Sequence, residues 1–174
     1  AAERCEKSRD IIKKPVDVSV EHLNRSINGI HVELSPLQVN DTLLLYSSLQ
    51  VDSFMYFDPA KFEEQKPVRK FYYASKQGFD WEGGNDFLGP FNKPGTEVGN
   101  GTFDRTGKKF YFTRCTKNYQ ERFVCNIFVS QKKDTAWSFP QKLPFPINLT
   151  SYTSTQPAIG YTSKGDHEVL YFVS

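Results

Sequence analysis

The sequence predicts an all-β fold made of repeated antiparallel sheets and preceded by one short α-helix. A high share of aromatic residues, frequent Gly and Pro, and an internal repeat of strand-like segments lead to this prediction. The 174 residues include fifteen Phe and nine Tyr, and aromatic residues favour the pleated, half-buried surface of a sheet. Ten Pro and eleven Gly supply turns between many short strands. The length is sufficient for one domain with its own core.

Residues 1–14 have the apolar spacing of a helix, unlike the rest of the chain. One narrow helix face is formed by small or apolar residues at i, i+4, i+7 and i+11, namely Ala1, Cys5, Ser8 and Ile12. Pro15 cannot continue the helix, so the pattern ends there. A lone helix of this length is marginal in water. We therefore expect residues 1–14 to be the last helix of an upstream helical region, packed on another element with Cys5 buried.

After Pro15 the spacing changes to the period of a strand. Val16, Val18 and Val20 alternate with polar residues, which predicts a half-buried strand. Three later segments share one order of strand, polar turn and apolar strand. They begin at Ser35-Pro36, Gly101-Thr102 and Gln156-Pro157 and end in residues 43–48, 110–113 and 169–174. Runs such as 43–46 are apolar at consecutive positions, which fits strands covered on both faces.

Matching segments with a Trp and an Asn lie between these strands and set the length of the repeat. They consist of an apolar strand, a Trp and an Asn, found as 71–75, Trp81 and Asn92, and again as 126–130, Trp137 and Asn148. Asn28 begins the same series. About four strands in roughly 55–65 residues is the scale of one blade of a β-propeller. The repeated Trp and Asn residues are predicted to be packing and turn devices.

We therefore predict a partial β-propeller over residues 15–174, made of four-stranded antiparallel sheets. Its units are expected at about 28–91 and 92–147, with an incomplete third unit at 148–174. Sheets that cannot bury both faces alone can do so by stacking on their neighbours. Propellers usually need about four to eight blades, so the chain is expected to be part of a longer protein.

Cys115 and Cys125 flank a polar segment, residues 117–122, that is typical of a hairpin tip. Their spacing would place them opposite one another on adjacent strands, and two interpretations stay open. One is a disulfide, which requires an oxidising compartment. The other is a pair of small buried side chains on neighbouring strands. No second Cys or His pair has the spacing of metal ligands, so no metal site is expected.

The sequence contains no recognisable catalytic motif, and we expect neither enzyme activity nor a cofactor. It has no nucleophile elbow and no phosphate-binding Gly loop. A glycosidase would need carboxylates that converge on one pocket. The residues that could contribute are Glu33, Asp52, Asp58, Asp104 and Glu168. The net charge is only +2 and the charges are interspersed, which argues against a nucleic-acid partner.

The repeats resemble the TolB-type, WD-like propeller repeats of Bacteroidota envelope proteins. The similar segments are 101–115, 126–130 with Trp137 and Pro140, and 155–174. Within this group the chain is most similar to the SprE and PorW family of type IX secretion and gliding-motility lipoproteins, with PorE similar in layout. Residues 1–14 resemble the final helix of the tetratricopeptide repeats in such proteins. The pair Cys115 and Cys125 also resembles a Cys pair in their propeller.

The resemblance implies a periplasmic protein at the outer membrane that acts as a non-enzymatic, protein-binding scaffold of the type IX machinery. Its partners would be other envelope or secretion proteins, and membrane association would come only from a lipid anchor outside this chain. The resemblance also implies O-glycosylation at Asp-Ser/Thr-aliphatic sites, a pattern that Thr42 and Thr135 fit. The alternative function is that of a propeller domain in a carbohydrate-active enzyme or a peptidase.

Overall fold

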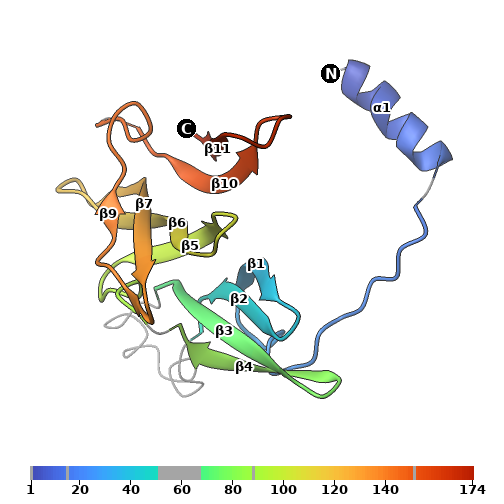
Figure 1. Ribbon diagram of the computed structural model, residues 1–174, viewed down its shortest axis with the longest axis horizontal. Helices are drawn as coiled ribbons and strands as arrows, with labels where there is room; N and C mark the ends of the chain where they lie inside the picture. The colour runs from blue at the N-terminus through green and yellow to red at the C-terminus, as the bar shows by residue number, and fades with distance from the viewer. Residues whose placement is uncertain (1, 15, 51–67, 88, 151) are drawn as a thin grey trace.

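The chain folds mainly into antiparallel β-sheets, with one short helix near its N-terminus (Figure 1). The computed structural model describes residues 2–14, 16–50, 68–87, 89–150 and 152–174. The elements are α1 (Ala2–Lys13), β1 (Glu33–Asn40), β2 (Leu43–Ser48), β3 (Lys70–Gln77), β4 (Asp80–Asp86), β5 (Glu97–Phe103), β6 (Lys109–Lys117), β7 (Phe123–Lys133), β8 (Ala136–Trp137), β9 (Gln141–Lys142), β10 (Thr155–Tyr161) and β11 (Glu168–Val173). The predicted β-rich fold after one short helix is confirmed.

The described strands form three separate sheets, and each sheet keeps the order of the chain. The first sheet has the order β1-β2-β3-β4, the second β5-β6-β7-β8, and the third β10-β11. In the second sheet β9 also pairs with β7, beyond β8. All of these pairings are antiparallel. Each sheet lies within one of the three units expected from the sequence, and the described sheets are not closed on one another.

The last strand of the second sheet is interrupted. β8 pairs with residues 132–133 of β7, and β9 pairs with residues 128–129. Between them, the Ser138 N–H still donates to Gln131 O at 2.8 Å, and Pro140 has no N–H to donate. The segment from β8 to β9 therefore acts as one broken fourth strand along β7.

A β-bulge recurs at the equivalent position in the first strand of each described sheet. Ser35 in β1, Asn100 in β5 and Gln156 in β10 have left-handed backbone, with φ of 53°, 50° and 53°. At each of these points the pairing with the second strand shifts in register, which is a β-bulge. Because a bulge bends its strand and increases its twist, the three first strands have the same local shape.

The three first strands lie near one another, and the sheets fan out from them in an open arc (Figure 1). β5 lies between β1 and β10 and contacts both. The bulges take part in these contacts, since Asn100 Nδ2 donates to Ser35 Oγ at 2.6 Å. Farther along, the Gln156 N–H donates to Thr113 Oγ1 at 3.1 Å. The repeated bulge thus connects each sheet to the next.

The first sheet is covered on both of its faces. Leu45 and Phe71 point to the second sheet and join a core cluster that includes Phe110 and Phe112. The neighbouring residues Leu44, Tyr46, Tyr72 and Ala74 belong to a second cluster, which also contains Ile27. The prediction that the apolar run of β2 is buried on both faces is confirmed.

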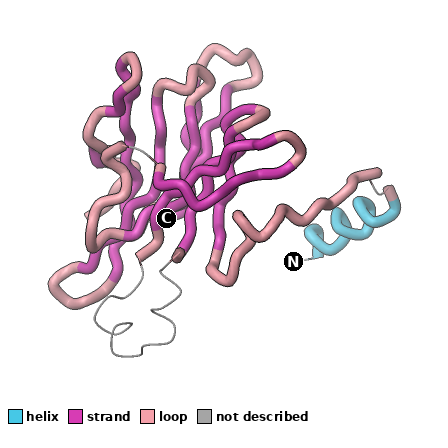
Figure 2. Tube along the Cα trace, turned by 90° about the horizontal axis from the view of Figure 1, so that it is seen from below, coloured by secondary structure: helices cyan, strands magenta, loops and turns pink. Residues whose placement is uncertain are grey.

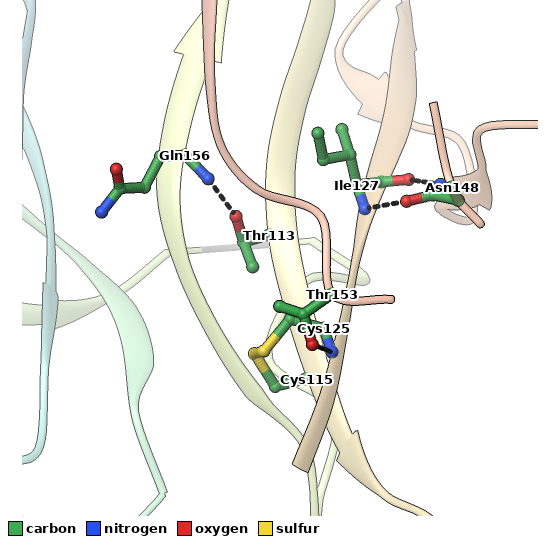
Figure 3. Close-up of a disulfide and its surroundings, with 7 residues drawn as sticks. All are labelled: Thr113, Cys115, Cys125, Ile127, Asn148, Thr153 and Gln156. Carbon is green, nitrogen blue, oxygen red and sulfur yellow. Dashed lines mark hydrogen bonds between the residues drawn. A yellow bond between two sulfur atoms is a disulfide. The ribbon is translucent and has the colours of Figure 1, made fainter. Parts of the chain in front are cut away.

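Two asparagines bind the end of a sheet to the third strand of the same sheet. Asn92 Nδ2 donates to Phe71 O, and Asn92 Oδ1 accepts from Phe71 N, both at 2.8 Å. Asn148 binds both main-chain groups of Ile127 in the same way and at the same distances (Figure 3). Each Asn lies 21 positions after its partner. The prediction that these asparagines are turn devices is confirmed, and we call this arrangement the asparagine corner.

The N-terminal segment differs from its prediction. Helix α1 lies to one side of the sheets, and an extended segment joins it to them (Figures 1 and 2). Ile12, expected on a packed face, is 76 % exposed, and the side chain of Cys5 is outside the described residues. The strand expected at Val16–Val20 is absent from the described sheets, and its valines are exposed. An alternating pattern forms a strand only where a partner strand supplies hydrogen bonds, and no described residue does so here.

Among the described residues, no helix has the length and apolar character needed to cross a bilayer.

Candidate functional site

A cleft of about 530 Å³ lies between the first and second sheets. One wall comes from β1, β2 and β3, and the other from β5, the β5–β6 turn, β7 and β8. Leu37, Leu45 and Phe103 contribute apolar surface, whereas Arg105 and Lys132 contribute positive charge. The cleft therefore combines an apolar lining with cations, a chemistry that suits peptide side chains.

Trp137 is the largest side chain of this cleft, and its position is fixed. Its ring packs edge-on against Phe91, with the ring centroids 5.6 Å apart. Lys132 Nζ, from the end of β7, lies 5.8 Å from the centroid of the Trp137 ring. The tight turn between β7 and β8, with Asp134 at φ 53°, brings the two side chains together. A fixed aromatic ring beside a cation is a suitable anchor for a protein partner.

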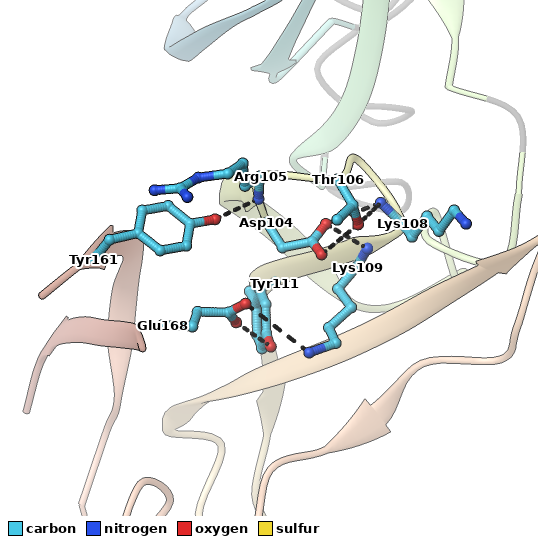
Figure 4. A network of polar contacts seen from close by, with 8 residues as sticks. All are labelled: Asp104, Arg105, Thr106, Lys108, Lys109, Tyr111, Tyr161 and Glu168. Atoms are coloured by element: carbon cyan, nitrogen blue, oxygen red, sulfur yellow. Dashed lines mark hydrogen bonds and ion pairs between the residues drawn. The ribbon is translucent and has the colours of Figure 1, made fainter. Parts of the chain in front are cut away.

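Asp104 directly follows the strand β5 and organises the turn at the edge of the cleft (Figure 4). Its carboxylate accepts hydrogen bonds from Thr106 Oγ1 at 2.6 Å and from the N–H groups of Lys108 and Lys109, both at 2.9 Å. Burial of Asp104 opposes ionisation, but these hydrogen bonds outweigh it and hold the pKa of the carboxyl below its ordinary value. Asp104 is therefore a charged turn-forming residue.

A second group of polar side chains joins the second sheet to the third (Figure 4). Tyr111 Oη donates to Glu168 Oε1 at 2.8 Å, and Lys109 Nζ lies 3.9 Å from Glu168 Oε2. Burial raises the pKa of Tyr111, and the hydrogen bond to Glu168 and its charge raise it further. The Arg105 guanidinium lies 3.8 Å from the centroid of the Tyr161 ring, and the Tyr161 hydroxyl accepts from Arg105 N. These contacts connect the turn at Asp104 to β10 and β11.

The carboxylates that a glycosidase would use have structural partners. Asp104 and Glu168 are bound as described above, and Glu33 Oε1 accepts from Ser48 Oγ at 3.3 Å. Asp104 lines the cleft, whereas Glu33 and Glu168 do not. Asp52 and Asp58 lie outside the described residues. Among the residues that the structure describes, no pair of these carboxylates therefore faces one pocket.

Cys115 and Cys125 are direct partners on β6 and β7 and form a disulfide (Figure 3). Their sulfurs are 1.96 Å apart and their Cα atoms 4.0 Å apart. The disulfide closes the β6–β7 hairpin, beyond which residues 118–122 form a loop that is exposed from residue 119 onward. Next to it, Ser154 N donates to Cys125 O at 3.0 Å. The disulfide thus strengthens the part of the second sheet on which the chain crosses to the third.

The two predicted O-glycosylation residues both lie in exposed turns. Thr42 is in the β1–β2 turn, where its N–H and Oγ1 donate to Asn40 Oδ1 at 2.9 and 3.1 Å. Thr135 is in the β7–β8 turn, next to Asp134. Both threonines are accessible from solvent, and they lie on different sheets.

Arg105, Lys132 and Tyr161 are not among the site residues expected from the sequence. A usable signal was the spacing of Lys132 and Trp137 around a short turn, which places both at one end of a hairpin. No such local signal exists for Arg105 and Tyr161, which are 56 positions apart.

The described residues contain no group of three or more His, Cys, Asp or Glu side chains that could hold a metal ion. The candidate site is therefore the cleft with Trp137, Lys132 and Arg105, next to the polar contacts that join the second and third sheets. Comparisons with protein families, with curated proteins and with solved structures found no match to this chain.

Proposed function

We propose that the chain is a non-enzymatic, protein-binding scaffold built as part of a β-propeller. The observation that carries this proposal is the repetition of one sheet design. A bulge recurs in the first strand of each sheet, and an asparagine corner follows both the first and the second sheet. Stacked sheets of this kind cover each other's faces and leave turns and clefts free to bind partners.

The cleft between the first two sheets supports a partner that is a protein. Its fixed Trp137 and the cations Arg105 and Lys132 are residue types that anchor protein interfaces. The engaged carboxylates favour this proposal over a glycosidase, because a hydrolase needs free acid and base groups at one pocket. We propose that the cleft takes an extended acidic segment with aromatic or aliphatic side chains.

Two observations support a periplasmic location and a role in type IX secretion or gliding. Disulfides persist in oxidising compartments, and Cys115 and Cys125 are bonded. The repeats 101–115 and 155–174 resemble those of the SprE and PorW lipoproteins. We therefore propose envelope components of this machinery as partners.

A co-purification experiment tests the scaffold proposal. The tagged chain is used as bait in an envelope extract, together with the charge-reversal variants Lys132→Glu and Lys142→Glu. Lys142 is exposed on β9 and does not line the cleft, so its variant is the matched control. Type IX or gliding components should be recovered with the wild type and the control, and several-fold less with Lys132→Glu.

Three outcomes would count against the proposal. Recovery of no envelope component with the wild type contradicts the scaffold role. Equal recovery with both variants contradicts the assignment of the cleft. Hydrolysis of glycosides or peptides by the purified chain contradicts a non-enzymatic function.

A further inference from the structure

A pocket of about 400 Å³ lies between the asparagine corner of Asn92 and the broken fourth strand of the second sheet. Two cations, two prolines, one aromatic ring and the corner Asn line it, namely Lys93, Arg114, Pro90, Pro140, Phe139 and Asn92. It shares no described lining residue with the cleft that contains Trp137. None of the described residues that line it carries a carboxylate, so its charge is positive.

In the first sheet the equivalent place is closed by direct contacts. The Trp and Asn of each repeat set the correspondence, which matches Ser26 with Pro90 and Gly83 with Phe139. The Ser26 hydroxyl donates to Trp81 O at 2.6 Å and accepts from Gly83 N at 3.2 Å. A Cβ atom on Gly83 would lie only 2.5 Å from Ser26 O, so no side chain fits there. In the second sheet a proline without a hydroxyl and a large phenylalanine replace this pair, and the pocket lies where the contact would be.

Arg114 is a further departure from the repeat at the same pocket. By the register of β2 and β6 with the third strands, Ser48 takes its place in the first sheet. Arg114 Nη2 donates to Pro90 O at 3.1 Å and to Phe91 O at 3.0 Å, and the guanidinium carbon lies 5.0 Å from the centroid of the Phe128 ring. The guanidinium is therefore held in a fixed position that the repeat itself does not require.

The charge of Arg114 is left without an anion. Its side chain is half-buried and forms no ion pair with any described residue. Its Nε atom is buried and has no hydrogen-bond partner in the described part of the chain, which is unfavourable. Burial also lowers the pKa of Arg114, because it disfavours the charged form. A carboxylate bound here would offset this burial through charge-assisted hydrogen bonds to the guanidinium.

We propose that this pocket binds the free C-terminal carboxylate of a partner polypeptide whose last residue is apolar. Arg114 and Lys93 bind the carboxylate, and Phe139 and the two prolines contact the last side chain. Phe139 is 84 % exposed, so its ring is free to pack on a ligand. Cations beside aromatic and apolar surface are a combination that anchors protein partners.

Two observations favour a chain end over an internal acidic segment. Pro90 and Pro140 have no main-chain N–H, and Arg114 already uses the Pro90 carbonyl, so these walls lack the donors that a passing strand would need. The volume of about 400 Å³ is near the lower end of ligand pockets, roughly 300–1,000 Å³, which suits one or two residues. A chain end has to enter only once, and it carries its carboxylate and its apolar side chain on one residue.

Peptide binding to the full chain tests the site. The probe is the peptide Gly-Ser-Gly-Ser-Ala-Leu with a free carboxylate and an N-terminal fluorescent label, and fluorescence anisotropy measures its affinity in a buffer without phosphate. One matched peptide ends in an amide, and another ends in an amide and has an internal Glu in place of the second Gly. The free acid should bind roughly tenfold more tightly than either amide, since a charge-assisted hydrogen bond is lost with its carboxylate. The free acid that ends in Ser should bind several-fold less tightly than the one that ends in Leu.

Variants of the chain then assign the binding to this pocket. Lys93→Gln and Phe139→Ala should each lower the affinity for the free acid several-fold. Lys142→Gln, on the exposed strand β9 and outside the pocket, is the matched control and should leave it unchanged. Arg114→Gln should abolish the preference for the acid over the amide. Because Arg114 also holds the corner, the variants of the exposed Lys93 and Phe139 keep the test valid where Arg114→Gln does not fold.

Four results would overturn the proposal. The first is no binding of the free acid, or equal affinity for the acid and the amide. The second is unchanged binding in the Lys93 and Phe139 variants. The third is tighter binding of the internal-Glu peptide, which would show that an acidic side chain is the occupant. The fourth is displacement of the probe by inorganic phosphate as readily as by unlabelled peptide, which would show a general anion site.

The inference rests on the proposed protein-binding function, but its test uses defined peptides and a different site. Recovery of no envelope component in the co-purification experiment would contradict the scaffold role and leave the acid-specific peptide binding intact. Equal binding of acid and amide would contradict the C-terminal site and leave the Lys132-dependent recovery of partners intact.

Discussion

Removal of the Asn148 side chain should destabilise the fold far more than removal of a comparable asparagine at the surface. Asn148 is 7 % exposed and makes three hydrogen bonds, to Ile127 N, Ile127 O and Leu143 O. A buried polar group left without its partner costs about 1–3 kcal/mol. Ile127 is fully buried, so water replaces the lost partners poorly. We expect Asn148→Ala to lower the free energy of unfolding by about 3 kcal/mol, which is roughly a hundredfold in the equilibrium constant.

Urea unfolding without reductant measures this change. Tryptophan fluorescence and far-UV circular dichroism should give coincident transitions, which the comparison of free energies requires. Asn118→Ala is the matched control, because Asn118 Oδ1 also accepts two backbone N–H groups, those of Gln120 and Arg122, but in an exposed loop. A cost for Asn148→Ala no larger than that of Asn118→Ala would refute the reasoning. Asn92→Ala, which removes two hydrogen bonds, should fall between them at about 2 kcal/mol.

Three further predictions concern the polar contacts and the disulfide of the second sheet. The pKa of Asp104 is lower in the folded state than its ordinary value of 3.8. Its contribution to the free energy of unfolding is therefore present above pH 3.8 and is lost as the pH falls through the folded pKa. In urea unfolding at decreasing pH, Asp104→Asn should lose less stability than the wild type. The folded pKa of Tyr111 is raised, so its contribution is present below the ordinary value of 10.0 and is lost as the pH rises above it. Tyr111→Phe should flatten this alkaline loss and, by removing the hydrogen bond to Glu168, cost about 0.5–1.5 kcal/mol at neutral pH in the same assay. Reduction of the Cys115–Cys125 disulfide, which spans 10 positions, should cost about 2–3 kcal/mol in urea unfolding with and without reductant, and an unchanged midpoint would contradict it.

The sequence was a good guide where the pattern is local. The consecutive apolar residues 43–46 predicted a strand buried on both faces, and Leu44 and Leu45 do lie in different core clusters. The recurrence of Asn92 and Asn148 predicted a structural role, because each Asn follows an apolar strand and a Trp in the same order along the chain.

Features that depend on distant partners could not be predicted in this way. The left-handed backbone at Ser35 and Gln156 has no local signal, because neither residue favours positive φ. It lies at the register shifts between the first and second strands of their sheets, so it depends on how these strands pair. The contact of Arg105 with Tyr161 arises only when the second and third sheets meet. Val16–Val20 has the period of a strand but no described partner, since periodicity reports which face is apolar and says nothing of what covers it.

The choice of asparagine at the corners explains how one design serves sheets with different cores. An apolar residue there would have to match the shape of its partner, and Phe71 and Ile127 differ in shape. A carboxamide instead offers one donor and one acceptor to the main chain, which is the same at every residue except proline. The corner can therefore be repeated without matching its surroundings, while the apolar residue directly before the Asn varies from Phe91 to Ile147.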